Sequence, residues 1–426
     1  MDPLPGRGAT APLALAPHLA ASALGRRTFV KGLALLPGVF LPRAAAAEVT
    51  FRLGLVVPNE PQRESGRLMA LGAQLGLDEA NALAGFFGKH LQLLQEVADT
   101  PEAVLAAGLR LARQERVVAL VGGADDASAA ALRDAAQRGD VLFFNVGATS
   151  NRLRGARCHR HAFHMEASLA MYVDAVGEWL LDQRKLARWM LITGNSSLGR
   201  EVEQAVITFL TRRGRSAAAV ERVAPGADEW AGVLQQVRRL APDVVFVGLD
   251  TSDLLSFLRQ YRAAGLSFQL AGVAADPSAL LTADPEDVSG VWPLLWHHEL
   301  QRFSARELNS RFRRRFGRSL EGRSWAAWAA VKLLGEAIVR TGGADLQGLL
   351  KYLEGAAPFD GHKGRPLTFR EWDHQLRQPM YLVTPRRKGQ GEGRWGSFEV
   401  VAEVPTGGDL DVIGEPKGES PCRFEG

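Results

Sequence analysis

The sequence predicts an α/β fold with two doubly wound lobes, in which helices cover both faces of mostly parallel sheets. Short apolar runs alternate with helical stretches from residue 49 to residue 272, as in successive strand–helix–strand units. Residues 117–121 and 243–249 are almost continuously apolar, which is typical of strands buried on both faces. With 426 residues, 46% hydrophobic and 23% charged, the chain is long enough for two domains.

The first lobe is predicted from alternating apolar and amphipathic stretches. Leu68, Leu71 and Leu75 share one face of the first helix, and Thr100-Pro101-Glu102 is a typical helix start because proline is favoured in the first turn. The expected strands are residues 49–58, 90–98, 117–121 and 141–145, and the expected helices are residues 67–82, 103–114 and 127–138.

Two turns within residues 116–150 indicate a binding wall. Gly122-Gly123 ends one predicted strand, and Gly147-Ala148-Thr149-Ser150 ends the next. In an open parallel sheet such turns lie at the carboxyl ends of neighbouring strands, where amide N–H groups and hydroxyl side chains can hold a small ligand. We therefore expect a ligand to bind at this edge.

The chain is expected to cross into a second sheet from Arg160, after the short run 162–165. The predicted strands of this half are residues 189–193, 217–223, 243–249 and 268–272, and the predicted helices are residues 169–182, 198–213, 229–240 and 252–264. Residues 288–296 should return the chain to the first domain. Helices at 305–316, 323–340 and 346–353, hairpin strands within 359–384 and a surface tail at 407–426 should follow.

The positive charge is concentrated at the amino terminus. The formal net charge is +4, but residues 1–47 hold five basic side chains against Asp2, so the rest of the chain is neutral. A neutral surface removes the main electrostatic reason to expect nucleic acid or an anionic membrane as a partner.

Residues 1–47 also predict export. Residues 25–31, GRRTFVK, resemble a twin-arginine motif, residues 33–41 are a short apolar run, and Ala44 to Ala47 supply small residues for cleavage near Ala47. The apolar run is too short to span a bilayer. We expect a periplasmic protein that begins near Glu48.

Cys158 and Cys422 are the two cysteines of the chain, and an oxidising compartment would permit a disulfide between them. Spacing alone leaves this pairing open. The segment from Cys158 to His164 also supports a competing hypothesis, a metal carrier or accessory protein, because it holds four possible metal ligands within seven residues. In an extended strand His159 and His161 would share one face and His164 would point the other way, so one metal ion could not easily bind them all.

Several strings in a consistent order resemble type I periplasmic binding proteins, which serve ABC importers of the branched-chain amino-acid type. They are residues 72–81 (GAQLGLDEAN), the 147–150 turn, Pro242-Asp243 before a buried strand, FLRQ at 257–260 ahead of AGL at 264–266, and WAAV at 328–331. The resemblance runs from about residue 49 to residue 384.

This resemblance implies two lobes joined by three crossing segments, with a ligand enclosed between them by hinge closure. Lobe 1 would comprise residues 48–161 and 290–358, and lobe 2 residues 162–289 and 359–404, with a tail at 405–426. The protein would be a monomer without enzymatic activity or cofactor, and an ABC permease would be its membrane partner.

Transfer of the family's pocket positions predicts an unusual ligand. Asp125 and Asp126 fall where the family binds a ligand carboxylate, residues 272–275 lack the acid that holds the ammonium group, and Leu198 replaces an aromatic residue. Because an uncompensated buried charge costs several kcal/mol, we expect a neutral or cationic organic ligand rather than a zwitterionic amino acid. Residues 360–379 further resemble a subgroup associated with pyrroloquinoline-quinone-dependent alcohol oxidation, which implies an alcohol-related ligand.

The candidate ligand contacts come from both lobes. Asp125, Asp126 and Thr149 could equally cap helices, and Trp328 could equally pack in the core, so these alternatives remain open. The candidates are Asn59, Glu60, Asp125, Asp126, Ala148, Thr149, Asn195, Asp250, Ala274 and Trp328.

Overall fold

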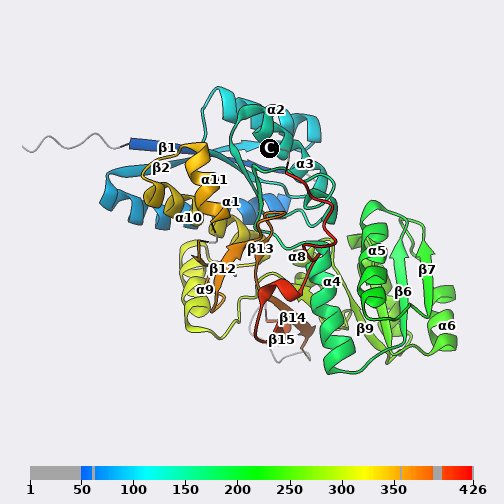
Figure 1. The fold of residues 1–426 in the computed structure, drawn as a ribbon. Coiled ribbons are helices and arrows are strands. Elements are labelled where there is room, and N and C mark those ends of the chain that lie inside the picture. The colour runs from blue at the N-terminus through cyan, green and yellow to red at the C-terminus, as the bar shows by residue number, and fades with distance from the viewer. Residues whose placement is uncertain (1–48, 60–62, 356, 387–395, 425–426) are drawn as a thin grey trace, which may run out of the picture. The chain divides into compact units, whose positions relative to one another are not determined.

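The computed structural model describes residues 49–59, 63–355, 357–386 and 396–424. The predicted export signal at residues 1–47 and the candidate contact Glu60 lie outside these ranges. The predicted α/β fold class is confirmed, since strands of parallel sheets alternate with helices along the chain (Figure 1).

The first sheet is parallel and has the strand order β2-β1-β3-β4-β5. Helices α2 and α3 cover one face, and α1 and α10 cover the other (Figure 1). The elements are β1 (Val49–Val57), α1 (Arg63–Ala84), β2 (Lys89–Val97), α2 (Pro101–Arg113), β3 (Ala119–Gly122), α3 (Asp126–Gly139), β4 (Leu142–Asn145), β5 (Ala162–His164) and α10 (Gly322–Thr341).

The second sheet is also parallel, with the order β7-β6-β8-β9. Trp189 and Phe246 pack on the α5 side, whereas Ile192 and Val247 pack on the opposite face with Trp230. The elements are α4 (Leu169–Glu178), continued by a π-helical turn (Trp179–Gln183), then β6 (Trp189–Gly194), α5 (Ser197–Arg212), β7 (Ala219–Val223), α6 (Ala231–Leu240), β8 (Val244–Gly248), α7 (Thr251–Ala263), β9 (Gln269–Gly272) and α8 (Pro277–Thr282).

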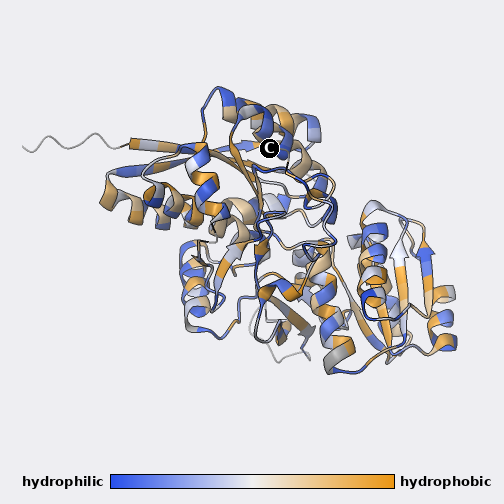
Figure 2. Ribbon diagram, in the orientation of Figure 1, coloured by the Kyte–Doolittle hydropathy of each residue, from blue (hydrophilic) through white to orange (hydrophobic). Residues whose placement is uncertain are grey.

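The last part of the chain adds helices and two small antiparallel sheets, β10-β14-β15 and β11-β12-β13. Helices such as α5 and α9 carry both hydrophilic and hydrophobic residues, as expected for helices with one covered face (Figure 2). The elements are β10 (Trp292–Leu294), α9 (Phe303–Phe316), α11 (Leu346–Glu354), β11 (Phe359–Asp360), β12 (Pro366–Phe369), β13 (Leu376–Arg377), β14 (Met380–Pro385) and β15 (Phe398–Val404).

The contact between α1 and α10 requires glycine. A Cβ atom at Gly72 would lie 2.0 Å from the Ser324 carbonyl oxygen, and one at Gly76 would lie 2.6 Å from that of Trp328. These distances are far inside van der Waals contact, so the two helix backbones can approach this closely only without side chains there. Two glycines of the 72–81 string are thereby explained.

One prediction about the first sheet is wrong, and one helix in the second half of the chain was not predicted. The run 162–165 was expected to begin the crossing into another sheet, but β5 pairs in parallel with β4, from Phe143 opposite Ala162 to Asn145 opposite His164. The α4 helix that opens the second series begins only after this strand. Helix α8, which follows β9, was not predicted.

The predicted surface tail is also in need of correction. Leu410, Ile413, Ser420 and Cys422 are buried, and Cys422 forms a disulfide with Cys158, with their Cα atoms 5.6 Å apart. Buried Arg370 donates hydrogen bonds to the Asp411 carboxylate and to the Ile413 carbonyl oxygen. A buried guanidinium needs hydrogen-bond acceptors, and residues of the tail supply them. The disulfide fixes the end of the tail to Cys158.

The predicted lobe boundaries remain a prediction. Within them, α11 packs against β12, although residues 359–404 were assigned to lobe 2 and α11 to lobe 1.

In the described part of the chain, no helix combines the length and the apolar character needed to cross a bilayer.

Replacing both cysteines, as Cys158→Ser/Cys422→Ser, should lower the free energy of unfolding by about 2–4 kcal/mol, because the disulfide closes a long loop in the unfolded chain. Urea denaturation without reductant measures the change. A reductant should cause a similar loss in the native sequence and none in the double variant. Equal stability of the two proteins without reductant would contradict a structural role.

Candidate functional site

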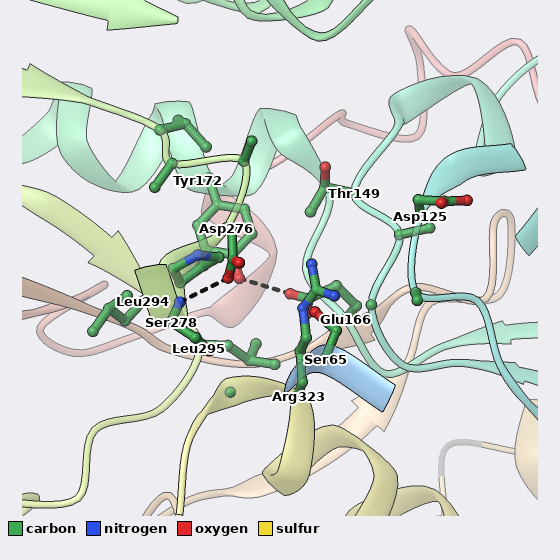
Figure 3. Close-up of a pocket in the computed structure, with 18 of the residues that line it drawn as sticks. Ser65, Asp125, Thr149, Glu166, Tyr172, Asp276, Ser278, Leu294, Leu295 and Arg323 are labelled. Carbon is green, nitrogen blue, oxygen red and sulfur yellow. Dashed lines mark hydrogen bonds between the residues drawn. The ribbon is translucent and has the colours of Figure 1, made fainter. Parts of the chain in front are cut away.

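A cavity of about 320 Å³ lies at the carboxyl ends of strands from both parallel sheets (Figure 3). Its volume is in the range of small-molecule sites. The segments after β3, β4 and β5 line it from the first sheet, and those after β8 and β9 line it from the second. Six of the predicted contact residues line this cavity: Asp125, Asp126, Ala148, Thr149, Asp250 and Ala274.

Three other candidates lie elsewhere. Asn59 is exposed, and its amide N–H donates to the Asp99 carboxylate. Asn195 is exposed in the loop after β6 and is not among the described lining residues. Trp328 is fully buried on the α1 side of α10, where its indole N–H donates to Glu79 at 3.1 Å, so the core-packing alternative holds for this side chain.

Asp125 and Asp126 both make structural hydrogen bonds at the start of α3. Asp125 accepts from the Ser128 amide at 2.8 Å, which caps the helix, and Asp126 accepts from the Ser150 amide at 3.0 Å. Burial raises the pKa of Asp126, while the bonds from Ser150 and Thr149 oppose the shift. The two carboxyl groups therefore stabilise the turns and also face the cavity.

Arg154 holds this wall in place, a role that was missed in the sequence. Its buried guanidinium donates to the carbonyl oxygens of Ala148 at 3.1 Å, Ser150 at 3.0 Å and Glu166 at 2.8 Å, and to the Gln375 side chain at 2.7 Å. Burial lowers its pKa to about 10, and the neighbouring Glu166 and Asp126 carboxyl groups oppose that shift. One cation thus joins three chain segments behind the cavity.

Lys363 acts similarly on the segment that follows β10. Its buried ammonium group donates to the Leu295 carbonyl oxygen at 2.7 Å, the Gln378 side chain at 2.9 Å and the Pro379 carbonyl oxygen at 3.2 Å. Leu295 itself lines the cavity. Burial lowers the pKa of Lys363 well below its usual value. Backbone acceptors thus hold the segment between β10 and α9 next to β14.

Glu166 and Tyr172 form a polar pair in the cavity that was not predicted. The Tyr172 hydroxyl donates to Glu166 Oε1 at 2.6 Å (Figure 3). The Ala167 amide donates to the same oxygen at 2.9 Å. Both residues are buried, and burial raises the pKa of Glu166. No motif surrounds them, and their place depends on β5 lying in the first sheet.

The wall of the cavity that follows β9 contains an acidic residue directly after residues 272–275. Residues 272–275 have none, as the sequence shows, but Asp276 lines the cavity and accepts from the Ser278 amide at 3.0 Å at the start of α8. Leu198, at the family's aromatic position, also lines the cavity. The argument from a missing acid is therefore weaker than the sequence indicated.

The start of α10 contributes two further charged residues that were not predicted, Glu321 and Arg323. Arg323 extends toward Glu166, and its Nη1 atom is buried without a hydrogen-bond partner among the described residues (Figure 3). The described lining contains six acidic residues and one basic residue, Arg323. The cavity is therefore strongly acidic overall.

The side chains that could have bound a metal ion at Cys158–His164 contact other protein groups. Cys158 is in the disulfide, buried His164 lies 3.1 Å from the Asn145 amide nitrogen, and the His159 and His161 rings meet edge to face at 4.9 Å. Among residues 49–424 with their gaps, no group of three or more His, Cys, Asp or Glu residues is placed to hold a metal ion. The competing hypothesis of a metal site at Cys158–His164 therefore finds no cluster of donors in the described chain.

Residues 50–390 match the model of the periplasmic binding protein family, so the chain belongs to that family. The predicted family resemblance is confirmed. Its members of this type are substrate-binding proteins of ABC transporters, in line with the cavity described above.

Individual relatives are more distant. The chain is 25% identical over 244 residues to a Leu/Ile/Val-binding protein homolog 4 from Brucella abortus, an alignment that covers 54% of this chain and 57% of the relative. The chain thus spans a little more than half the length of that curated relative. The finer resemblance of residues 360–379 to the subgroup associated with alcohol oxidation stays a prediction.

Two crystal structures show the same fold. A branched-chain amino-acid ABC transporter ligand-binding protein from Burkholderia xenovorans has a TM-score of 0.80 at 18% identity, covering 88% of this chain and 99% of that one. The closed form of a leucine-, isoleucine-, valine-, threonine- and alanine-binding protein from Brucella ovis has a TM-score of 0.78 at 20% identity, with the same coverage.

Removing the Arg154 side-chain charge by Arg154→Met should lower the free energy of unfolding by about 3 kcal/mol or more, because buried carbonyl oxygens would lose their donor. Urea denaturation measures this. Arg152→Met is the matched control, because Arg152 is exposed two residues away and its loss should cost under about 0.5 kcal/mol. Similar losses in both variants would contradict the anchoring role.

Proposed function

We propose that this protein is the periplasmic solute-binding component of an ABC-type importer, which captures a small organic ligand in the cavity and delivers it to a membrane permease. Family membership, the cavity at the strand ends of both sheets and the export signal expected in the sequence support this proposal. The protein binds its ligand as a monomer and does not convert it. Closure follows when the ligand binds the closed state more tightly than the open state.

The ligand carries an ammonium or hydroxyl group and no free carboxylate. The observation that carries this proposal is the lining, with six acidic side chains against one guanidinium. A ligand carboxylate would leave water to face this negative field, which costs several kcal/mol unless it is paired. An ammonium group gains from the same field, and a hydroxyl group can donate to it without a charge penalty.

A zwitterionic amino acid is the second candidate. Arg323 favours it, because an Nη1 atom without a partner could pair with a carboxylate while Asp276 accepts from an ammonium group. The names of the relatives above refer to such ligands. An alcohol-related ligand agrees with the hydroxyl option and rests on the resemblance of residues 360–379 alone.

Four probes that share a 3-methylbutyl chain separate these ligand classes. Isoamylamine carries the ammonium group, isoamyl alcohol the hydroxyl, 4-methylpentanoate the carboxylate, and leucine both charges. We expect the amine and the alcohol to raise the melting temperature of the mature protein, with about 2.7 kcal/mol of stabilisation at one hundred times the dissociation constant. Differential scanning fluorimetry measures the shift.

The outcomes divide cleanly. A large shift with leucine and none with the amine would replace the main proposal by the amino-acid candidate. A shift with 4-methylpentanoate alone would contradict the argument from the acidic lining. If none of the four probes, nor any member of a wider panel of amines and alcohols, shifts the melting curve, the proposed ligand class is wrong.

A further inference from the structure

Glu321 is a buried carboxyl group in the cavity, and one of its two oxygens has no hydrogen-bond partner among the described residues. It lies at the amino end of α10, and 5% of the residue is exposed. Oε2 accepts a hydrogen bond from the Ser278 hydroxyl, whereas Oε1 has no partner within the described residues. A buried acceptor without a donor is unfavourable, so a donor from a ligand would recover that loss.

This carboxyl group connects the two walls of the cavity. Ser278 belongs to α8, which follows the last strand of the second sheet, while Glu321 begins the helix that covers the first sheet. The backbone around Glu321 is itself fixed, since its amide donates to the Ser324 hydroxyl at 2.9 Å and its carbonyl accepts from the Trp325 amide at 2.8 Å. The carboxyl group is therefore positioned before a ligand arrives.

The charges that face Glu321 do not neutralise it. Arg318 attracts it but also forms an ion pair with Glu64, and Glu64 and Asp276 both repel it. Arg323, two residues further along α10, also lines the cavity, and its side chain extends toward Glu166 (Figure 3). Burial, together with the two neighbouring carboxylates, raises the pKa of Glu321 to about 7.

Building on the proposed function, we propose that Glu321 Oε1 binds the ammonium group of the ligand, while Oε2 keeps its bond to Ser278. The ammonium N–H donates to Oε1, and the cation also replaces the missing positive charge at this end of the cavity. Because one carboxyl group then contacts the ligand and both walls, ligand binding strengthens a contact that the closed form needs.

The inference predicts a particular pH dependence. Glu321 must be ionised to attract a cation, and with a pKa of about 7 its ionised fraction rises from about one tenth at pH 6 to about nine tenths at pH 8. An alkylamine stays protonated over this range. Isoamylamine should therefore bind about tenfold more tightly at pH 8 than at pH 6, with release of a proton, whereas isoamyl alcohol should not gain affinity.

The test is isothermal titration calorimetry of the mature protein with isoamylamine at pH 6, 7 and 8, in two buffers of different ionisation enthalpy. Glu321→Gln should lower the affinity at pH 8 at least tenfold and should remove the pH dependence and the proton release attributed to Glu321. Glu307→Gln, which makes the same change at an exposed position of α9, should behave like the native protein. Binding by Glu321→Gln that matches the native protein at each pH would overturn the inference.

A second variant keeps the test decisive if Glu321→Gln does not fold. Ser278→Ala removes the hydrogen bond that lowers the pKa of Glu321, so the midpoint of the affinity profile should move to higher pH. An unchanged midpoint would count against the role of Glu321. If the native protein binds neither isoamylamine nor any other amine, the amine form of the proposed function fails with it; if the native protein binds amines and both variants behave like it, only the inference about Glu321 fails.

Discussion

The Arg154 guanidinium is the interaction on which the geometry of the site depends most. This group donates hydrogen bonds to the turn after β4, to the segment after β5 and to the Gln375 side chain. At Ala148, Ser150 and Glu166 the chain is neither helix nor strand, and the Arg154 side chain supplies a donor for their carbonyl oxygens. A lysine could not replace the planar fork, because one ammonium group presents a single centre rather than several directed N–H bonds.

Acidic side chains dominate the charged lining of the cavity. Asp125 and Asp126 serve the helix start, Glu166 is bonded to Tyr172, and Glu321 reaches across to Ser278. Burial raises the pKa of three of these groups, Asp126, Glu166 and Glu321, and so reduces the repulsion among them near neutral pH. A cation that enters the cavity would reverse this shift, which links ligand charge to proton release.

The sequence predicted the regular elements well and the site only in part. Local patterns were sufficient for β8 or α3, because apolar runs and helix caps lie within a few residues of each other. They were insufficient for Glu321, Arg323 and Tyr172, which reach the cavity through contacts between segments far apart in the chain. Trp328 shows the same limit, since the helical pattern did not reveal that its side of α10 lies against α1.

The pairing of α1 with α10 also bears on how the chain acquires its structure. Helix α1 ends at Ala84 and its partner begins at Gly322, so the whole second sheet is synthesised between the two. Until the ribosome has made residues 322–341, the small-residue side of α1 has no surface to cover it. The first sheet can therefore have both of its faces covered only after most of the chain has been synthesised.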